Sequence, residues 1–176
     1  PLTLRPEGTA GAARAYVEHK VHNSQPVTKW YYIGPMFRAE RPQKGRYRQF
    51  YQAGAEIYGD KGPAADAEMI DTLVGFLNAI GVSSPEVLVN SIGGSETRAK
   101  YRDAIVAALE PKKASLSDDS QKRLSTNPLR ILDSKDPRDK EAVAQLPSLV
   151  DFLSDDDRAH FDALRRHLDA LKTPYR

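Results

Sequence analysis

The chain has 176 residues and a formal net charge of +2, and its length suits one large domain or two small ones. It contains no cysteine, which excludes disulfides, thiolate zinc sites and a cysteine nucleophile. No apolar run reaches the roughly 18 residues of a membrane helix, and the four histidines show no metal-ligand spacing. We therefore expect a cytoplasmic protein with no membrane partner and no metal site of its own.

The chain opens with an alternating segment, residues 2–5, which predicts a half-buried strand that ends at Pro6. A turn at residues 7–9 follows, and Thr9 is a candidate N-cap for a helix over about 10–22. Because the first residue is Pro and lies in this strand pattern, we expect the chain to be an internal piece of a longer protein.

The next segment, residues 29–59, predicts two aromatic-rich strands over about 29–38 and 49–58, joined by a basic loop. Residues 29–48 carry six Lys and Arg side chains against a single acidic one, Glu40. Since the whole chain is nearly balanced in charge, this concentration of positive charge indicates a local anion site.

Strand alternation places Gln52, Gly54 and Glu56 on the same face of the second strand, where they form an open polar surface. The two polar side chains either face water or bind a charged ligand, because a buried carboxylate needs a partner. Arg38, at the end of the first strand, is either a solvated partner of Glu40 or a ligand for a phosphate. Glu7, with Thr9, either forms an ordinary turn or binds an ammonium group.

Helical periodicity then predicts a helix over about 64–80, followed by a short strand over 86–92. From residue 95 the pattern is wholly helical, with Ser117 and Ser154 as expected N-caps and the following expected helices: 95–109, 118–124, 139–146, 148–152 and 155–171. We expect an α+β domain over residues 1–93 and a small all-helical domain over 94–176.

Several motifs resemble the histidyl-tRNA synthetase family of class II aminoacyl-tRNA synthetases. LRPEGT opens the match, FRAE at 37–40 resembles the class II motif 2, and RPQKGRYRQF at 41–50 resembles the long loop of the histidine enzymes. The helices after residue 94 are similar to the bacterial insertion domain. The resemblance implies a class II antiparallel sheet fragment, with the motif 2 hairpin at about 29–59, followed by that insertion domain.

The resemblance also implies roles for individual residues. Arg38 is the expected catalytic residue and binds ATP together with Glu40. The side chains expected to bind histidine are Glu7, Thr9, Gln52 and Glu56. The residues expected to contact the acceptor end of tRNA-His are Gln43, Lys44 and Arg46.

The implied reaction is ATP-dependent activation of histidine, followed by its transfer to tRNA-His, in a homodimer that uses Mg²⁺ with ATP. No Mg²⁺ ligand is assigned in this chain. Class II motifs 1 and 3, the second arginine motif and the anticodon-binding domain have no match in it, so we expect the chain alone to be inactive. Two other functions stay open: a non-catalytic paralogue, such as the regulatory subunit of ATP phosphoribosyltransferase, and a plain RNA-binding module.

Overall fold

The computed structural model describes residues 3–41, 43–82 and 84–176. The chain divides into two compact units, residues 1–85 and 86–176. The boundary predicted from the sequence, near residue 93, lies eight residues after residue 85, where the first unit ends. The assignment of the two parts as catalytic core and insertion domain stays a prediction.

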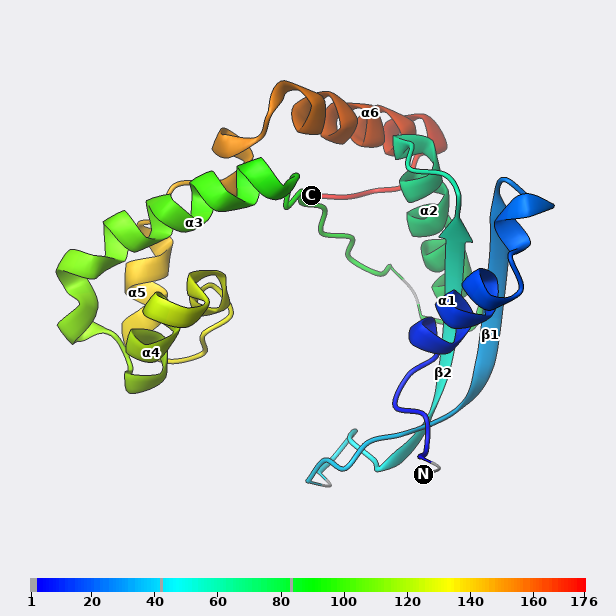
Figure 1. Cartoon of the computed structure of the whole chain (residues 1–176), viewed down its shortest axis with the longest axis horizontal. Coiled ribbons are helices and arrows are strands. Elements are labelled where there is room, and N and C mark those ends of the chain that lie inside the picture. Colours follow the sequence, from blue (N-terminus) through cyan, green and yellow to red (C-terminus); the bar gives the residue numbers. More distant parts are fainter. Residues whose placement is uncertain (1–2, 42, 83) are drawn as a thin grey trace. The chain divides into compact units, whose positions relative to one another are not determined.

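The first unit is built on an antiparallel hairpin of two ten-residue strands, β1 (Thr28–Phe37) and β2 (Gln49–Tyr58) (Figure 1). Tyr32 lies opposite Gly54 in the register, and Trp30 lies opposite Glu56. Because side chains alternate along a strand, the hairpin has two distinct faces. We call one of them the inner face, and it carries Trp30, Tyr32, Gly34, Gln52, Gly54 and Glu56.

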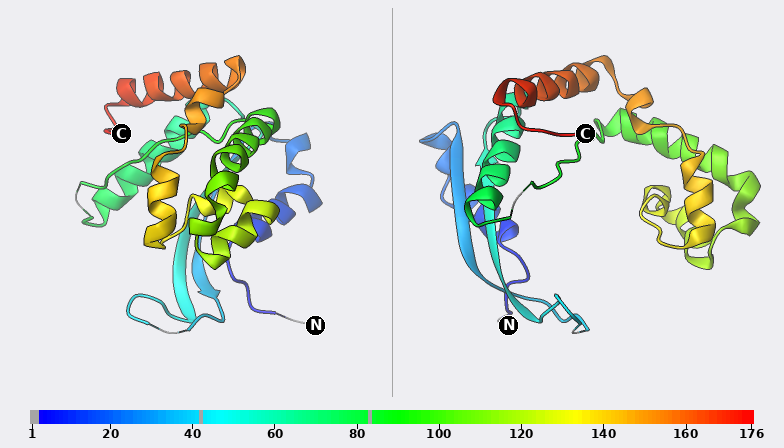
Figure 2. Two further views of the ribbon diagram at one scale, coloured as in Figure 1. Left: turned by 90° about the vertical axis from the view of Figure 1, so that its left-hand side faces the viewer. Right: turned by 180° about the vertical axis from the view of Figure 1, so that it is seen from behind.

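The two helices of this unit lie on opposite sides of the hairpin (Figures 1 and 2). Helix α1 (Thr9–Glu18), followed by the short helix η1 (Val21–Asn23), covers part of the inner face, where the Tyr16 and Tyr58 rings stack with centroids 4.5 Å apart. Helix α2 (Pro63–Ala79) lies on the other side, where Glu68 forms an ion pair with Lys29.

The second unit is wholly helical. In chain order its elements are α3 (Ser95–Leu109), η2 (Glu110–Ser115), α4 (Asp118–Thr126), η3 (Pro128–Ile131), α5 (Pro137–Ala144), η4 (Leu149–Phe152) and α6 (Asp155–Leu171). Its core joins α3, α4, η3, α5 and the residue that follows η2 through the buried side chains of Tyr101, Ile105, Leu109, Leu116, Leu124, Ile131 and Ala142. Among the described residues this is the main apolar cluster of buried side chains.

Polar contacts fix the ends of these helices. The predicted N-caps are confirmed: the Ser117 hydroxyl accepts a bond from the Ser120 amide, and that of Ser154 accepts one from the Asp157 amide. Asp157 in turn accepts hydrogen bonds from the Gly94 amide, at 2.9 Å, and from the Thr97 hydroxyl, at 2.8 Å, which links the starts of α3 and α6. These bonds lower the pKa of the Asp157 carboxyl.

Asp139 is fully buried and accepts hydrogen bonds from the Ser117 amide and from three hydroxyls, those of Ser117, Ser120 and Ser134. Burial alone would raise the pKa of this carboxyl. The hydrogen bonds from Ser117, Ser134 and Ser120 outweigh burial and hold its pKa below the usual value of an aspartate. The carboxylate therefore ties the start of α4 to the start of α5.

Three local predictions were wrong or only partly testable. Thr9 is not the N-cap of α1, because that position belongs to Gly8 and the Glu7 carboxylate accepts the Ala10 amide at 2.9 Å. In the strand expected over residues 2–5, Leu2 lies outside the described residues, and residues 3–5 do not form a strand. Pro42, in the basic loop, also lies outside the described residues. The carbonyl of Arg5 nevertheless accepts a hydrogen bond from the Phe37 amide at 2.9 Å, so this segment lies alongside the C-terminal end of β1.

The strand expected over 86–92 is also absent: this segment has no regular secondary structure in its described residues. It makes one short parallel pairing, in which Val89 N donates to the Arg176 carbonyl and Arg176 N donates to the Val87 carbonyl, both at 3.0 Å. One paired residue does not make a ladder. No helix in the described part of the chain is long and apolar enough to cross a membrane.

Candidate active site

Two of the four residues predicted to bind histidine, Gln52 and Glu56, lie on the inner face of the hairpin, and a third, Thr9, contacts this face. Tyr32 stands at its centre, with its hydroxyl 3.2 Å from Thr9 Oγ1 and 3.4 Å from Glu56 Oε1. Gln52 lies on the same face, opposite Gly34 in the register. The structure therefore brings Thr9 and Glu56 together, although the two residues are 47 positions apart in the sequence.

Gln52 has a side-chain oxygen, Oε1, that is buried and has no hydrogen-bond partner among the described residues. A buried acceptor without a donor costs free energy, on the order of 1–3 kcal/mol. Such an atom, on the same hairpin face as the Glu56 carboxylate, suits a ligand that brings its own N–H donor. One carboxylate oxygen of Glu7, Oε1, accepts a hydrogen bond from the Ala10 amide, so the ordinary turn that the sequence allowed is present. The other oxygen, Oε2, takes no part in this hydrogen bond.

Arg38 lies just beyond the last residue of β1. Its Nε donates to the Pro6 carbonyl at 3.0 Å, and its guanidinium carbon is 4.9 Å from the centre of the Phe50 ring. These two contacts fix the direction of the side chain, while the residue as a whole remains exposed. A guanidinium held in this way can bind a phosphate or a carboxylate through its terminal N–H groups.

The basic loop folds into a tight turn at its tip. Gln43 and Arg46 exchange backbone hydrogen bonds of 3.2 and 2.8 Å, and Gly45 takes a φ of +78°, which a type II turn requires at this position. Gln43, Lys44 and Arg46 are all exposed. Glu40, which is predicted to bind ATP, forms an ion pair of 3.6 Å with Arg46.

A pocket of about 750 Å³ lies beside this face, within the size range of small-molecule sites. Its lining includes Glu7, Gly8, Trp30, Tyr32 and Gly34. The pocket thus joins the turn at the start of α1 to strand β1. Gln52, Glu56 and Arg38 are not part of its wall.

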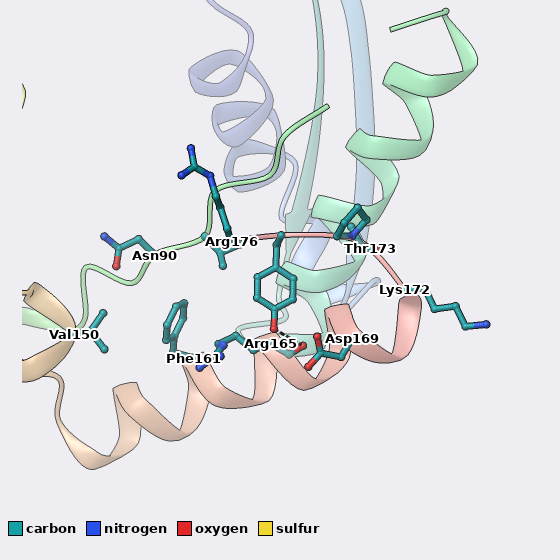
Figure 3. A pocket seen from close by; sticks show the side chains of 11 residues that line it. Asn90, Val150, Phe161, Arg165, Asp169, Lys172, Thr173 and Arg176 are labelled. Carbon is teal, nitrogen blue, oxygen red and sulfur yellow. Dashed lines mark hydrogen bonds between the residues drawn. The ribbon is translucent and has the colours of Figure 1, made fainter. Parts of the chain in front are cut away.

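A second pocket, of about 730 Å³, lies in the helical unit between α6 and the segment 173–176 (Figure 3). Tyr175 belongs to its wall, and the hydroxyl of this residue donates to the Arg165 carbonyl at 3.5 Å. Two basic residues of its wall, Arg165 and Arg176, have acidic partners in Asp162 and Glu86. None of the residues predicted from sequence to bind a ligand lies in this wall.

The sequence-based predictions missed Tyr32. Its hydroxyl links two candidate site residues, Thr9 and Glu56. In the sequence, however, one tyrosine in an aromatic-rich strand cannot be told apart from a residue that only packs. The one sequence signal is indirect: Gly8 and Gly54 leave the space that the Tyr32 ring fills. Without the strand register, nothing in the sequence relates these glycines to Tyr32.

The polar hairpin face carries an unpaired acceptor and a carboxylate, and the arginine at the end of β1 and the exposed basic turn add positive charge; this set of groups has the chemistry to bind a small cationic ligand and an anion. The structure of apo histidyl-tRNA synthetase from Staphylococcus aureus matches with a TM-score of 0.73 and 35% identity, over 97% of this chain and 39% of that one. The fold is therefore that of part of a class II synthetase.

Sequence comparison is more specific. The family model described as histidyl-tRNA synthetase matches residues 1–172. The histidine–tRNA ligase of Sorangium cellulosum is 63% identical, and that of Thermosynechococcus vestitus 52% identical, each over 174 residues that make up 99% of this chain. The chain belongs to the histidyl-tRNA synthetase family. It spans 41% of the length of these two relatives.

Proposed function

We propose that the chain forms the ATP- and histidine-binding hairpin of a histidine–tRNA ligase, together with that enzyme's helical insertion domain. The observation that carries the proposal is the inner face itself: Tyr32 joins Thr9 to Glu56, Gln52 lies on the same face, and Arg38 follows the end of β1, in a member of this family. The proposed reaction forms histidyl-adenylate from histidine and ATP and then transfers histidine to tRNA-His.

Arg38 is proposed as the catalytic residue of the first step. The histidine carboxylate attacks the α-phosphorus of ATP and pyrophosphate leaves, so negative charge gathers on two anions that are forced together. A guanidinium whose direction is already fixed by Pro6 and Phe50 stabilises this charge without reorganising. Glu40 is proposed to bind the adenine end of ATP, which requires its ion pair with Arg46 to open.

Of the four candidates for binding histidine, Glu7 and Glu56 are charged, whereas Thr9 and Gln52 are neutral. Glu7 and Glu56 are proposed to bind the α-ammonium and the imidazole, with support from the Thr9 hydroxyl. The unpaired oxygen of Gln52 accepts one of the ligand N–H groups. Such a site rejects apolar amino acids strongly, because its own buried groups would then be left without partners.

The exposed turn at residues 43–46 is proposed to contact the acceptor end of tRNA-His through Gln43, Lys44 and Arg46. Exposed basic side chains on a protruding turn suit recognition of RNA through its backbone and shape. The homodimer and the cytoplasmic location belong to the proposal as properties of the whole ligase.

Mg²⁺ enters only as a companion of ATP. Residues 3–41, 43–82 and 84–176 contain no group of three or more histidine, cysteine or acidic side chains that would hold a metal ion. No Mg²⁺ ligand of this chain is therefore proposed.

The test is histidine-dependent ATP–pyrophosphate exchange in a ligase that carries this sequence. We expect Arg38→Ala to lower kcat by about 10²–10³-fold, and Gln52→Ala and Glu56→Ala to raise the KM for histidine. Glu18→Ala, which removes an exposed carboxylate of α1, is the matched control and should change neither. An unchanged KM for histidine in both inner-face variants would refute the pocket assignment.

The same protein tests the tRNA role. Arg46→Ala should weaken aminoacylation and lower the salt dependence of tRNA binding by about one unit of slope, with little effect on adenylation. Equal losses in both steps would contradict a contact that serves tRNA alone. Binding of tRNA without any exchange activity would favour the RNA-binding module, or the non-catalytic paralogue, over the ligase.

A further inference from the structure

The Tyr32 ring occupies space that two glycines leave open. A Cβ built on Gly8 would lie 2.2 Å from Cε2 of this ring, and one built on Gly54 would lie 2.3 Å from Cζ. Contacts this short are not tolerated in proteins, so neither position accepts a side chain while the ring is present. The ring therefore sits between the turn before α1 and strand β2, and packs on the backbone of both.

The hydroxyl at the end of that ring connects the same two segments. It lies 3.2 Å from Thr9 Oγ1 and 3.4 Å from Glu56 Oε1. An ionised carboxylate only accepts hydrogen bonds, so the tyrosine proton is directed to Glu56. The tyrosine oxygen then accepts the proton of Thr9, and the three groups form a chain that runs from Thr9 through Tyr32 to Glu56.

We propose that Tyr32 is a positioning residue for histidine, which holds Thr9 and Glu56 in one geometry before the substrate arrives. This inference rests on the proposed function, because it assumes that Thr9 and Glu56 bind histidine. The bond to Tyr32 occupies Oε1 of Glu56 and leaves Oε2 as the oxygen available to the ligand. Without that bond the carboxylate turns freely, and binding has to order it.

The position also explains why the arrangement requires a tyrosine. Phenylalanine at 32 would fill the same space between Gly8 and Gly54 but would leave Thr9 and Glu56 unlinked. A smaller residue would lose both the packing and the hydroxyl. Tyr32→Phe therefore separates the positioning role from the role of the ring in the fold.

The experiment is steady-state ATP–pyrophosphate exchange with Tyr32→Phe in a ligase that carries this sequence. We expect the KM for histidine to rise by about 10–100-fold, as for the loss of a hydrogen bond to a charged group, with the KM for ATP changed less than about twofold. The melting temperature should stay within about 2 °C, because the ring remains. Tyr51→Phe is the matched control, since Tyr51 lies on the opposite face of the hairpin and is 75% exposed.

A double-mutant cycle adds a readout that a merely structural tyrosine would not move. If Tyr32 acts through Thr9, the effects of Tyr32→Phe and Thr9→Ala on the KM for histidine will be less than additive. Additive effects, an unchanged KM for histidine, or equal changes in the two KM values would each overturn the positioning role. Absence of exchange in the unmutated protein would instead refute the proposed function, so the two failures are distinct.

Discussion

Single residues decide whether the hairpin can form, and the glycine that ends β2 shows this most clearly. Gly59 has a φ of +88°, and a Cβ added there would lie 1.8 Å from the carbonyl oxygen of Pro26. The residue therefore faces two independent obstacles to substitution, an unfavourable backbone angle and a clash with a neighbouring backbone. Backbone atoms, unlike side chains, cannot rotate away.

Gly59→Ala should consequently destabilise the first unit by about 2 kcal/mol or more. Gly75→Ala is the matched control: Gly75 lies inside α2 with open space around it, so alanine should stabilise by about 0.5–1 kcal/mol. Urea unfolding followed by the fluorescence of Trp30, the single tryptophan, measures both changes. A Gly59→Ala variant as stable as the unmutated chain would contradict the argument.

For single residues, some predictions from the sequence were correct and others were wrong. Alternation correctly placed Gln52 and Glu56 on one face, because the period of a strand is fixed by its geometry. Thr9 was wrongly expected to cap α1, since the longer Glu7 side chain reaches the Ala10 amide instead. Tyr32 could not have been found, because its role depends on which residues lie opposite it across the strands.

Elements were more predictable than contacts. Both strands and the long helices α2, α3 and α6 lie within about one residue of the predicted bounds, because each combines strong periodicity with a clear start or stop signal. The segment 86–92 was wrong for a physical reason. Its alternating residues suit a strand, but a strand requires a partner, and in the described chain only Arg176 pairs with it.

The link between α4 and α5 gives a prediction at this scale. The pKa of Asp139 is lowered in the folded protein, so the folded state binds fewer protons than the unfolded state as the pH falls below about 5. The stability that Asp139 contributes is present above its unfolded pKa, taken as 3.8, and is lost as the pH falls through the lower folded value. The helical unit should therefore become less stable between about pH 5 and pH 2.

Asp139→Asn tests this link. It should lower the free energy of unfolding of the helical unit at pH 7 by about 1–3 kcal/mol and reduce its dependence on acidic pH. Hydrogen exchange of α3, α4 and α5 measures the change locally. Asp133→Asn makes the same chemical change at an exposed position and should have little effect. Equal pH dependence in the Asp139→Asn variant and the unmutated chain would show that other groups cause it.

At the scale of the whole molecule, the two units differ in how much apolar surface they bury. The described apolar residues that are buried in the first unit are Met36, Ala65 and Ala67. The helical unit buries eleven, among them Ile105, Leu109 and Leu168. Large apolar side chains remain exposed mainly in the first unit, including Tyr31 at 81% and Ile33 at 67%. Because burial of apolar surface is the main stabilising term, the first unit should be the weaker of the two.

This difference predicts that the 176-residue chain unfolds in two steps. Trp30 reports only on the first unit, whereas most of the helical signal in far-UV circular dichroism comes from the second. In urea, the fluorescence change should therefore precede the main loss of helical signal, and amides of α3 should exchange more slowly than those of β1. Deletion of the buried side chain in Ile105→Ala should shift the second step to lower urea and leave the first unchanged, because Ile105 lies in the core of the helical unit. Coincident transitions by both probes would mean that the two units unfold as one cooperative body, despite their unequal cores.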